Sequence, residues 1–150
     1  VSRSREFQKT YNGFYRVRRN AEWQDVYFNL MEMAKTKPLD FSQIISDLRR
    51  KTGRLEASFA SKLVATLHPD RPVIDRFVLE YFSLRLPGHY EMDREAKAVS
   101  VYEALISKYE TFLTLPVARI ICEKFKATYP WAHITDLKKV DLILWQTRAT

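Results

Sequence analysis

Apolar residues recur at helical spacing along most of this chain, whereas alternating runs rich in β-branched residues, which are typical of half-buried strands, are scarce. The chain is also poor in glycine, with three in 150 residues. The pattern predicts an all-α fold, a compact array of about seven short helices. The predicted helices span residues 21–36, 40–52, 55–67, 75–84, 93–113, 116–129 and 136–148, with an eighth at 2–11.

Each predicted break between helices has a local chemical cause. Lys37 precedes a proline and is therefore pushed out of the helical region, and Asp40 is placed to cap the next helix. The Pro87-Gly88 pair ends another helix, and Pro116 stands where a first helical turn tolerates proline. Thr135 is placed to cap the final helix, which carries an apolar stripe for the core.

Length and composition favour a single all-α domain over residues 1–150. A chain of 150 residues buries roughly 68–70% of the surface that its unfolded form exposes, which is enough for one compact core. The content of 46% hydrophobic and 13% aromatic residues argues against disorder. Because the chain begins with Val1 instead of methionine, the sequence favours an N-terminally trimmed form.

Cysteine and histidine usage argues against a disulfide or a metal site. The single cysteine, Cys122, excludes an internal disulfide and lies in an apolar run that is typical of a buried thiol. His68, His89 and His133 have no partners at the spacing of metal ligands. No Walker-like loop or dinucleotide-binding glycine pattern occurs. We therefore expect no metal and no cofactor.

The hydropathy pattern predicts a protein that does not span a membrane. No run of apolar residues approaches 18 in length, and no signal-peptide pattern opens the chain. The expected location is therefore the cytoplasm.

The charge balance is that of a candidate nucleic-acid-binding protein. The chain has 25 Lys and Arg against 18 Asp and Glu, a formal net charge of +7, although soluble basic proteins of other kinds share this property. Arginines near the N-terminus alternate with aromatic residues, which suits phosphate contacts and base stacking, or equally a solvated helix with aromatics in the core. With DNA favoured over RNA, the candidate contacts are Arg16, Arg18, Arg19, Arg49, Arg50, Lys51, Arg54 and Arg76.

Lys62 is the first candidate for chemistry. On a helical wheel it lies just outside the apolar arc of its helix, beside Phe59 and Thr66. A lysine at such a rim can simply extend its amine to water. Alternatively, a partly desolvated amine at this position could attack an aldehyde-like carbon and form a Schiff base.

Asp75 is the second candidate, because it stands at the mouth of a predicted helix. It is placed to cap that helix, with Ile74 and Leu79 as a hydrophobic staple. A carboxylate at this position could also stabilise the positive charge that develops when a glycosidic bond is cleaved. Capping and catalysis do not exclude each other.

One predicted helix of this chain carries a single lysine and is followed by a short connector. The next helix opens with the run Pro72-Val73-Ile74-Asp75-Arg76-Phe77-Val78. This segment, about residues 53–82, resembles the catalytic segment of the helix-hairpin-helix DNA glycosylase superfamily. The resemblance implies an all-α fold and a DNA glycosylase or AP lyase activity in DNA repair. It also implies that Lys62 attacks the deoxyribose C1′ of a flipped-out nucleotide and that Asp75 assists.

Two other interpretations stay open at this stage. The protein could be a non-enzymatic helical domain that binds nucleic acid, with Lys62 as a phosphate contact; DNA binding would then persist after Lys62→Ala, with no activity in either protein. It could also be a protein-interaction module whose basicity is incidental, which would bind no oligonucleotide.

Overall fold

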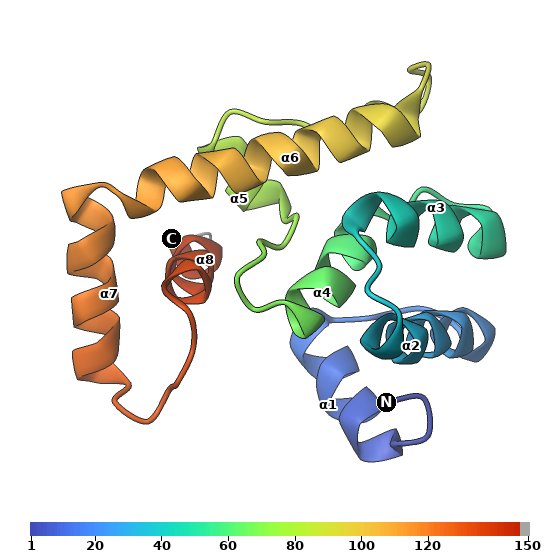
Figure 1. The fold of residues 1–150 in the computed structure, drawn as a ribbon, viewed down its shortest axis with the longest axis horizontal. Helices are drawn as coiled ribbons and strands as arrows, with labels where there is room; N and C mark the ends of the chain where they lie inside the picture. The colour runs from blue at the N-terminus through green and yellow to red at the C-terminus, as the bar shows by residue number, and fades with distance from the viewer. Residues whose placement is uncertain (148–150) are drawn as a thin grey trace. The chain divides into compact units, whose positions relative to one another are not determined.

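A computed structural model of the chain describes residues 1–147 (Figure 1). Helices make up its regular structure and no strand occurs in that range, which confirms the predicted all-α class. None of the described helices is long and apolar enough to cross a membrane. The helices are α1 (Arg5–Tyr15), α2 (Ala21–Thr36), α3 (Phe41–Thr52), α4 (Ala57–Leu67), α5 (Arg76–Tyr81), α6 (Arg94–Leu113), α7 (Pro116–Thr128) and α8 (Asp136–Gln146).

The helix bounds follow the local signals closely, with two differences. The end predicted at residue 148 lies outside the described residues, and α2, α3, α4, α6 and α7 match their predicted bounds within two residues. Helix α5 ends at Tyr81 instead of residue 84, because Ser83 adopts a left-handed φ of +55° and the Leu84 N–H bonds back to the Leu79 carbonyl at 2.8 Å. Helix α1 begins three residues later than predicted, where Ser4 caps it, and it also ends four residues later than predicted, at Tyr15.

Two predicted caps explain where α3 and α8 begin. The Asp40 carboxylate accepts a hydrogen bond from the Gln43 N–H at 2.8 Å, and the Gln43 side chain accepts one from the Asp40 N–H at 3.0 Å. The Thr135 hydroxyl accepts one from the Lys138 N–H at 3.2 Å. Both predicted caps are therefore confirmed, and Asp40 forms a complete capping box.

The chain forms two compact units, Val1–Glu56 and Ala57–Thr150. Helices α1 to α3 belong to the first unit and α4 to α8 to the second. The expectation of a single domain over residues 1–150 stays a prediction.

Aromatic side chains fill much of the first unit, in which α2 packs against α3. The hydroxyl groups of Tyr11 and Tyr27 share a hydrogen bond of 2.7 Å, and the Trp23 and Tyr27 rings stack with centres 4.8 Å apart. Burial raises the pKa of Tyr27 well above its usual value. Tyr11 therefore belongs to the core, whereas Phe14 is exposed.

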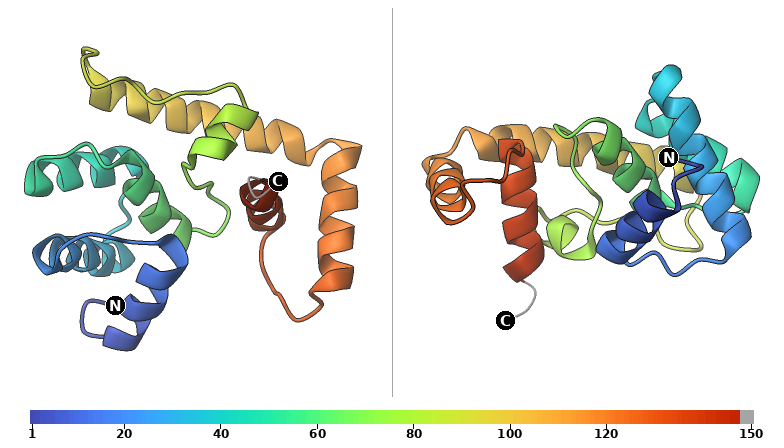
Figure 2. Two further views of the ribbon diagram at one scale, coloured as in Figure 1. Left: turned by 180° about the vertical axis from the view of Figure 1, so that it is seen from behind. Right: turned by 90° about the horizontal axis from the view of Figure 1, so that it is seen from below.

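The second unit is built around α8, which packs against α5, α6 and α7. The chain turns sharply between α6 and α7, as Figures 1 and 2 show from three directions. Pro116 is the first residue of α7, as predicted. Val78 of α5, Leu105 and Tyr109 of α6 and Val140 of α8 are completely buried and form the centre of this unit.

Candidate functional site

The connector between α4 and α5 is fastened to α4 by two serine side chains. The Ser61 hydroxyl accepts a hydrogen bond from the Ile74 N–H at 2.8 Å and donates one to the Ser58 carbonyl at 2.8 Å. The Ser58 hydroxyl in turn donates to the Ile74 carbonyl at 2.9 Å. Both backbone polar groups of Ile74 are therefore bonded to α4, and we call Ser58, Ser61 and Ile74 the serine clasp.

Two further hydroxyl groups hold the same connector from other parts of the second unit. Tyr102 of α6 donates a hydrogen bond to the Pro72 carbonyl at 3.1 Å. Thr135, the cap of α8, donates one to the Pro69 carbonyl at 2.7 Å. A connector tied at several carbonyls has few alternative conformations, so Asp75, which follows it, begins α5 from a fixed place.

The serine clasp limits how far apart the backbone positions of the two candidate catalytic residues can lie. Lys62 follows Ser61 directly, and Asp75 follows Ile74 directly. Since Ser61 and Ile74 are joined by a hydrogen bond, ordinary bond lengths limit the distance between the Lys62 and Asp75 α-carbons to about 14 Å. The fold thus holds the two backbone positions within that distance of each other in the second unit.

The Lys62 side chain is half-buried, in keeping with its predicted position at the rim of the apolar arc. Its ammonium group lies 4.7 Å from the centre of the Phe59 ring, a distance that suits a cation–π contact. The Thr66 hydroxyl donates a hydrogen bond to the Lys62 carbonyl at 2.7 Å. The amine therefore lies beside an aromatic ring of its own helix.

Asp75 caps α5, as predicted. One oxygen of its carboxylate accepts a hydrogen bond from the Phe77 N–H at 3.0 Å. Ile74 and Leu79 are both buried, as a hydrophobic staple requires. The capping contact uses one of the two carboxylate oxygens and fixes the direction of the side chain.

A buried ionic cluster, which was not predicted from the sequence, lies within electrostatic reach of Asp75. Tyr109 donates its hydroxyl hydrogen to Asp141 at 2.9 Å, and the Lys138 ammonium lies 3.1 Å from the other Asp141 oxygen. Burial raises the pKa of Asp141 despite Lys138 and Tyr109, and the negative charge of Asp75 raises it further. Burial, Asp141 and Asp75 together raise the pKa of Tyr109 well above its usual range.

One feature of the sequence indicates that Asp141 is a buried ionisable residue. It lies four residues after Leu137 and three before Leu144, on the apolar stripe of the final helix, where an ionisable side chain is out of place. Asp141 is only 6% exposed. Buried ionisable groups of this kind occur at functional sites and in structural ion-pair networks alike.

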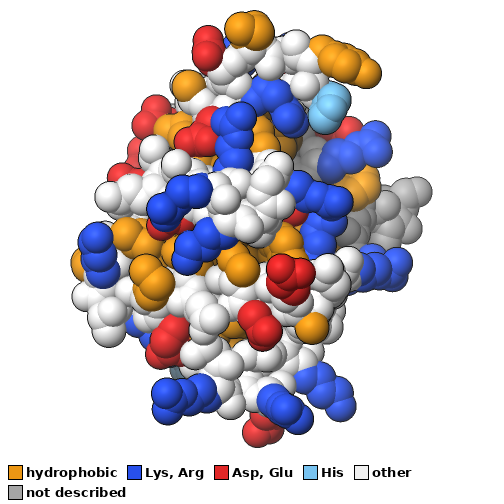
Figure 3. Space-filling model, turned by 90° about the vertical axis from the view of Figure 1, so that its right-hand side faces the viewer, with side chains coloured by type: hydrophobic (Ala, Val, Ile, Leu, Met, Phe, Trp, Pro, Cys, Tyr) orange, Lys and Arg blue, Asp and Glu red, His pale blue; other side chains and the backbone are white. Residues whose placement is uncertain are grey.

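The positive charge of the protein is dispersed on the face drawn in Figure 3. Lys and Arg side chains are spread over this face, with Asp and Glu side chains and apolar side chains among them. Net charge alone therefore does not mark a binding site there.

Ion pairs with carboxylates involve several of the predicted nucleic-acid contacts. Arg50 pairs with Asp47 on α3, Arg76 pairs with Glu80 on α5 at 2.8 Å, and Arg19 pairs with Glu56 at 2.9 Å. The first two arginines are exposed, whereas Glu56 is buried. Their charges are thus partly offset within the protein.

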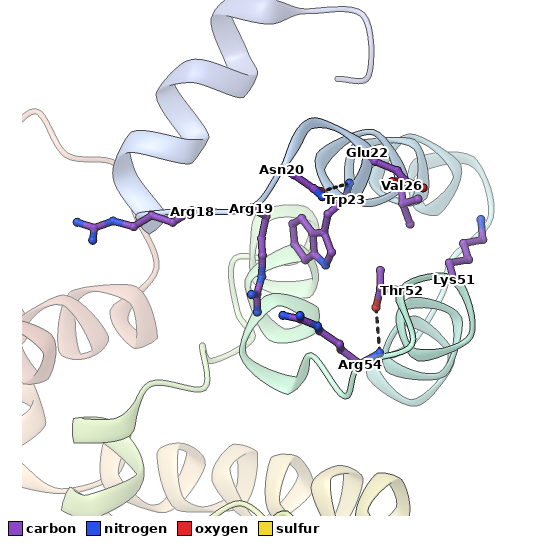
Figure 4. Close-up of a pocket in the computed structure, with 9 residues that line it drawn as sticks. All are labelled: Arg18, Arg19, Asn20, Glu22, Trp23, Val26, Lys51, Thr52 and Arg54. Carbon is purple, nitrogen blue, oxygen red and sulfur yellow. Dashed lines mark hydrogen bonds between the residues drawn. The ribbon is translucent and has the colours of Figure 1, made fainter.

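Four of the eight predicted contacts line one hollow of about 390 Å³ in the first unit. They are Arg18, Arg19, Lys51 and Arg54, and Trp23 and Val26 lie among them (Figure 4). In this view the Arg19 and Arg54 side chains approach each other beside the indole, while Arg18 extends away. We call the six residues the cationic hollow. Arg16, Arg49 and Arg50 belong to the same unit but lie outside its lining, and Arg76 belongs to the second unit.

Metal ligands do not gather in the described part of the chain. Among residues 1–147, no group of three or more His, Cys, Asp or Glu side chains is arranged to hold a metal ion. Cys122 is half-buried, instead of fully buried as expected, and this burial raises the pKa of its thiol.

Comparison of the chain with protein-family models, with curated proteins and with solved structures gives no match.

Proposed function

We propose that this protein binds DNA and cleaves the bond between a base and its deoxyribose, with Lys62 as the nucleophile and Asp75 as the assisting carboxylate. The observation that supports this most directly is the serine clasp, because it bonds Ile74, the residue before Asp75, to Ser61, the residue before Lys62, and so holds the start of α5 against α4. Covalent catalysis needs its nucleophile and its stabilising charge at fixed positions.

The proposed reaction begins with a neutral Lys62 amine and a nucleotide flipped out of the helix, since a stacked base cannot be reached. A bond forms between Nζ and C1′ while the bond from C1′ to the base nitrogen breaks. The bonding electrons leave with the base, which takes up a proton, and the amine loses one. Opening of the sugar ring then gives a Schiff base, and the Asp75 carboxylate stabilises the positive charge that develops at C1′.

Borohydride trapping tests this proposal. The reagent reduces a Schiff base to a stable amine, so a DNA duplex with an abasic site should become covalently attached to the protein. Lys62→Ala should abolish the adduct, and circular dichroism should show that the variant is still folded. Lys108→Ala, which removes an exposed lysine from α6, should trap as much DNA as the original protein. Equal trapping by both variants would contradict the role of Lys62.

A non-enzymatic nucleic-acid-binding domain is the second candidate. The contact between the Lys62 ammonium and the Phe59 ring favours it, because this contact stabilises the charged form of the amine. In that case DNA binding should persist in Lys62→Ala, and neither protein should give an adduct with abasic, damaged or intact DNA.

A further inference from the structure

The cationic hollow has a rigid floor. Trp23 is 8% exposed, and its ring stacks on Tyr27 at an interplanar angle of 18°. The Asn20 side chain accepts a hydrogen bond from the Trp23 N–H at 2.9 Å and so fixes the start of α2 at this point. Val26, one turn further along, is half-buried beside it. The floor is thus an apolar surface whose shape is set by the core of the first unit.

One wall of the hollow is an arginine held in place from behind. The Arg19 guanidinium lies 2.9 and 3.1 Å from the two carboxylate oxygens of Glu56, which is 7% exposed. It also lies 5.8 Å from the centre of the Trp23 ring. An arginine with these two contacts keeps one orientation, so less conformational entropy is lost when it binds an anion.

The opposite wall comes from the end of α3. Gly53 adopts a left-handed φ of +70° and turns the chain there. The Thr52 hydroxyl donates to the Leu48 carbonyl at 2.7 Å and accepts from the Arg54 N–H at 3.3 Å. This turn directs the exposed Arg54 side chain toward Arg19 (Figure 4). Lys51 also lines the hollow, but its side chain extends away from these two arginines.

The charges around the hollow favour an anion. Its four cationic side chains are opposed by Glu22 on the lining and by Glu56 behind Arg19. The volume of about 390 Å³ lies within the range of about 300–1,000 Å³ that is usual for small-ligand sites. A cationic rim above an apolar floor fits a group that is anionic at one end and planar and apolar at the other.

From this arrangement we infer that the cationic hollow binds one nucleotide unit, with its phosphate between Arg54 and Arg19 and its base or sugar over Trp23 and Val26. The inference rests on the proposed function only in taking nucleic acid as the natural source of that nucleotide. Guanidinium groups suit a phosphate because they donate two parallel hydrogen bonds. The second unit, which contains Lys62 and Asp75, contributes no residue to this hollow.

Nuclear magnetic resonance titration of the full chain tests the inference with three probes: thymidine 5′-monophosphate, thymidine and inorganic phosphate. The monophosphate should shift the backbone signals of residues 18–26 and 51–54 and the Trp23 indole signal. It should bind at least five-fold more tightly than either thymidine or inorganic phosphate. Equal affinity for inorganic phosphate would overturn the nucleotide assignment, and shifts confined to other residues would overturn the site.

Variants distinguish binding at the hollow from unspecific attraction of the monophosphate to positive charge. Arg54→Ala should weaken binding of the monophosphate about ten-fold, and Arg54→Lys should restore only part of it, because lysine lacks the planar fork. Arg5→Ala removes the same charge from an exposed position of α1, and it should change the affinity less than two-fold. Equal losses in Arg54→Ala and Arg5→Ala would contradict a specific site. Failure of the original protein to give a borohydride-trapped adduct, together with binding of the monophosphate at these residues, would dismiss the proposed chemistry and leave this site intact.

Discussion

Ser61 supplies, with its side chain, the hydrogen-bond acceptor for the backbone N–H of Ile74, at a distance of 2.8 Å and without exposure to solvent. Ile74 is itself almost fully buried. A buried N–H that loses its acceptor costs about 1–3 kcal/mol, because water cannot replace the missing partner. This one hydroxyl therefore both stabilises the second unit and sets the place from which Asp75 begins α5.

Ser61→Ala should lower the free energy of unfolding by about 1–3 kcal/mol, since it leaves the Ile74 N–H without its acceptor. Urea denaturation followed by circular dichroism would measure the change. Ser107→Ala removes an exposed hydroxyl from α6 and should change the same free energy by no more than about 0.5 kcal/mol. If the two variants were equally stable, the clasp would contribute nothing beyond an ordinary surface serine.

Asp141 should titrate above the usual range for an aspartate, because burial disfavours its charged form. Carbon-13 signals of the carboxyl group would give its pKa directly. Asp75→Asn should lower that pKa, since it removes a negative charge that raises it. An unchanged pKa of Asp141 in Asp75→Asn would show that the two carboxyl groups do not interact.

The raised pKa of Asp141 also predicts how stability depends on pH. A carboxyl group with a higher pKa in the folded state binds more protons there than in the unfolded chain. Its contribution to stability is therefore complete below the unfolded pKa of about 3.9 and is lost as the pH rises through the folded value. Asp141→Asn lacks this contribution, so the stability of the original protein relative to Asp141→Asn should fall over that interval. A constant difference would contradict the prediction.

DNA affinity should fall steeply with salt, and the arginines should differ in how much they contribute. The double variant Arg18→Ala with Arg54→Ala should reduce the magnitude of the slope of log affinity against log salt concentration by about 1–2. The reason is that each phosphate contact of duplex DNA contributes roughly 0.9 to this slope. Arg50→Ala with Arg76→Ala should change the slope much less, since both residues pair with carboxylates. Fluorescence anisotropy with a labelled duplex would measure both slopes, and equal changes would indicate unspecific attraction to net charge.

Sequence reasoning succeeded where the cause of a structure is local. Asp40 and Thr135 cap their helices through residues three positions away, so short stretches of sequence are enough to predict both caps. Asp75 caps α5 for the same reason. The early end of α5 was missed because it depends on a left-handed conformation at Ser83, which nothing in the residue type requires.

The rest of the candidate site depends on contacts between residues far apart in the chain. Ser61 bonds to a residue 13 positions away, and Tyr109 bonds to Asp141 across 32 positions. A helical wheel relates only residues of the same helix. It therefore cannot predict the hydrogen bond of Ser61 with Ile74 or that of Tyr109 with Asp141. The pairing of Arg19 with Glu56, 37 positions apart, could not be predicted for the same reason, although the local clusters of basic residues that contribute to the hollow are visible in the sequence.

The comparison of Asp75→Asn with Asp75→Ala separates capping from catalysis. Asparagine caps helices about as well as aspartate, so Asp75→Asn should keep nearly all of the stability, whereas Asp75→Ala should lose about 0.5–2 kcal/mol. If the carboxylate also stabilises charge at C1′, Asp75→Asn should slow formation of the borohydride-trapped adduct by about 100-fold, because the negative charge is lost while the fold is kept. Stability by urea denaturation and single-turnover trapping rates on the same preparations would provide both readouts. Full trapping by Asp75→Asn, with instability confined to Asp75→Ala, would make Asp75 a structural cap and remove it from the proposed chemistry.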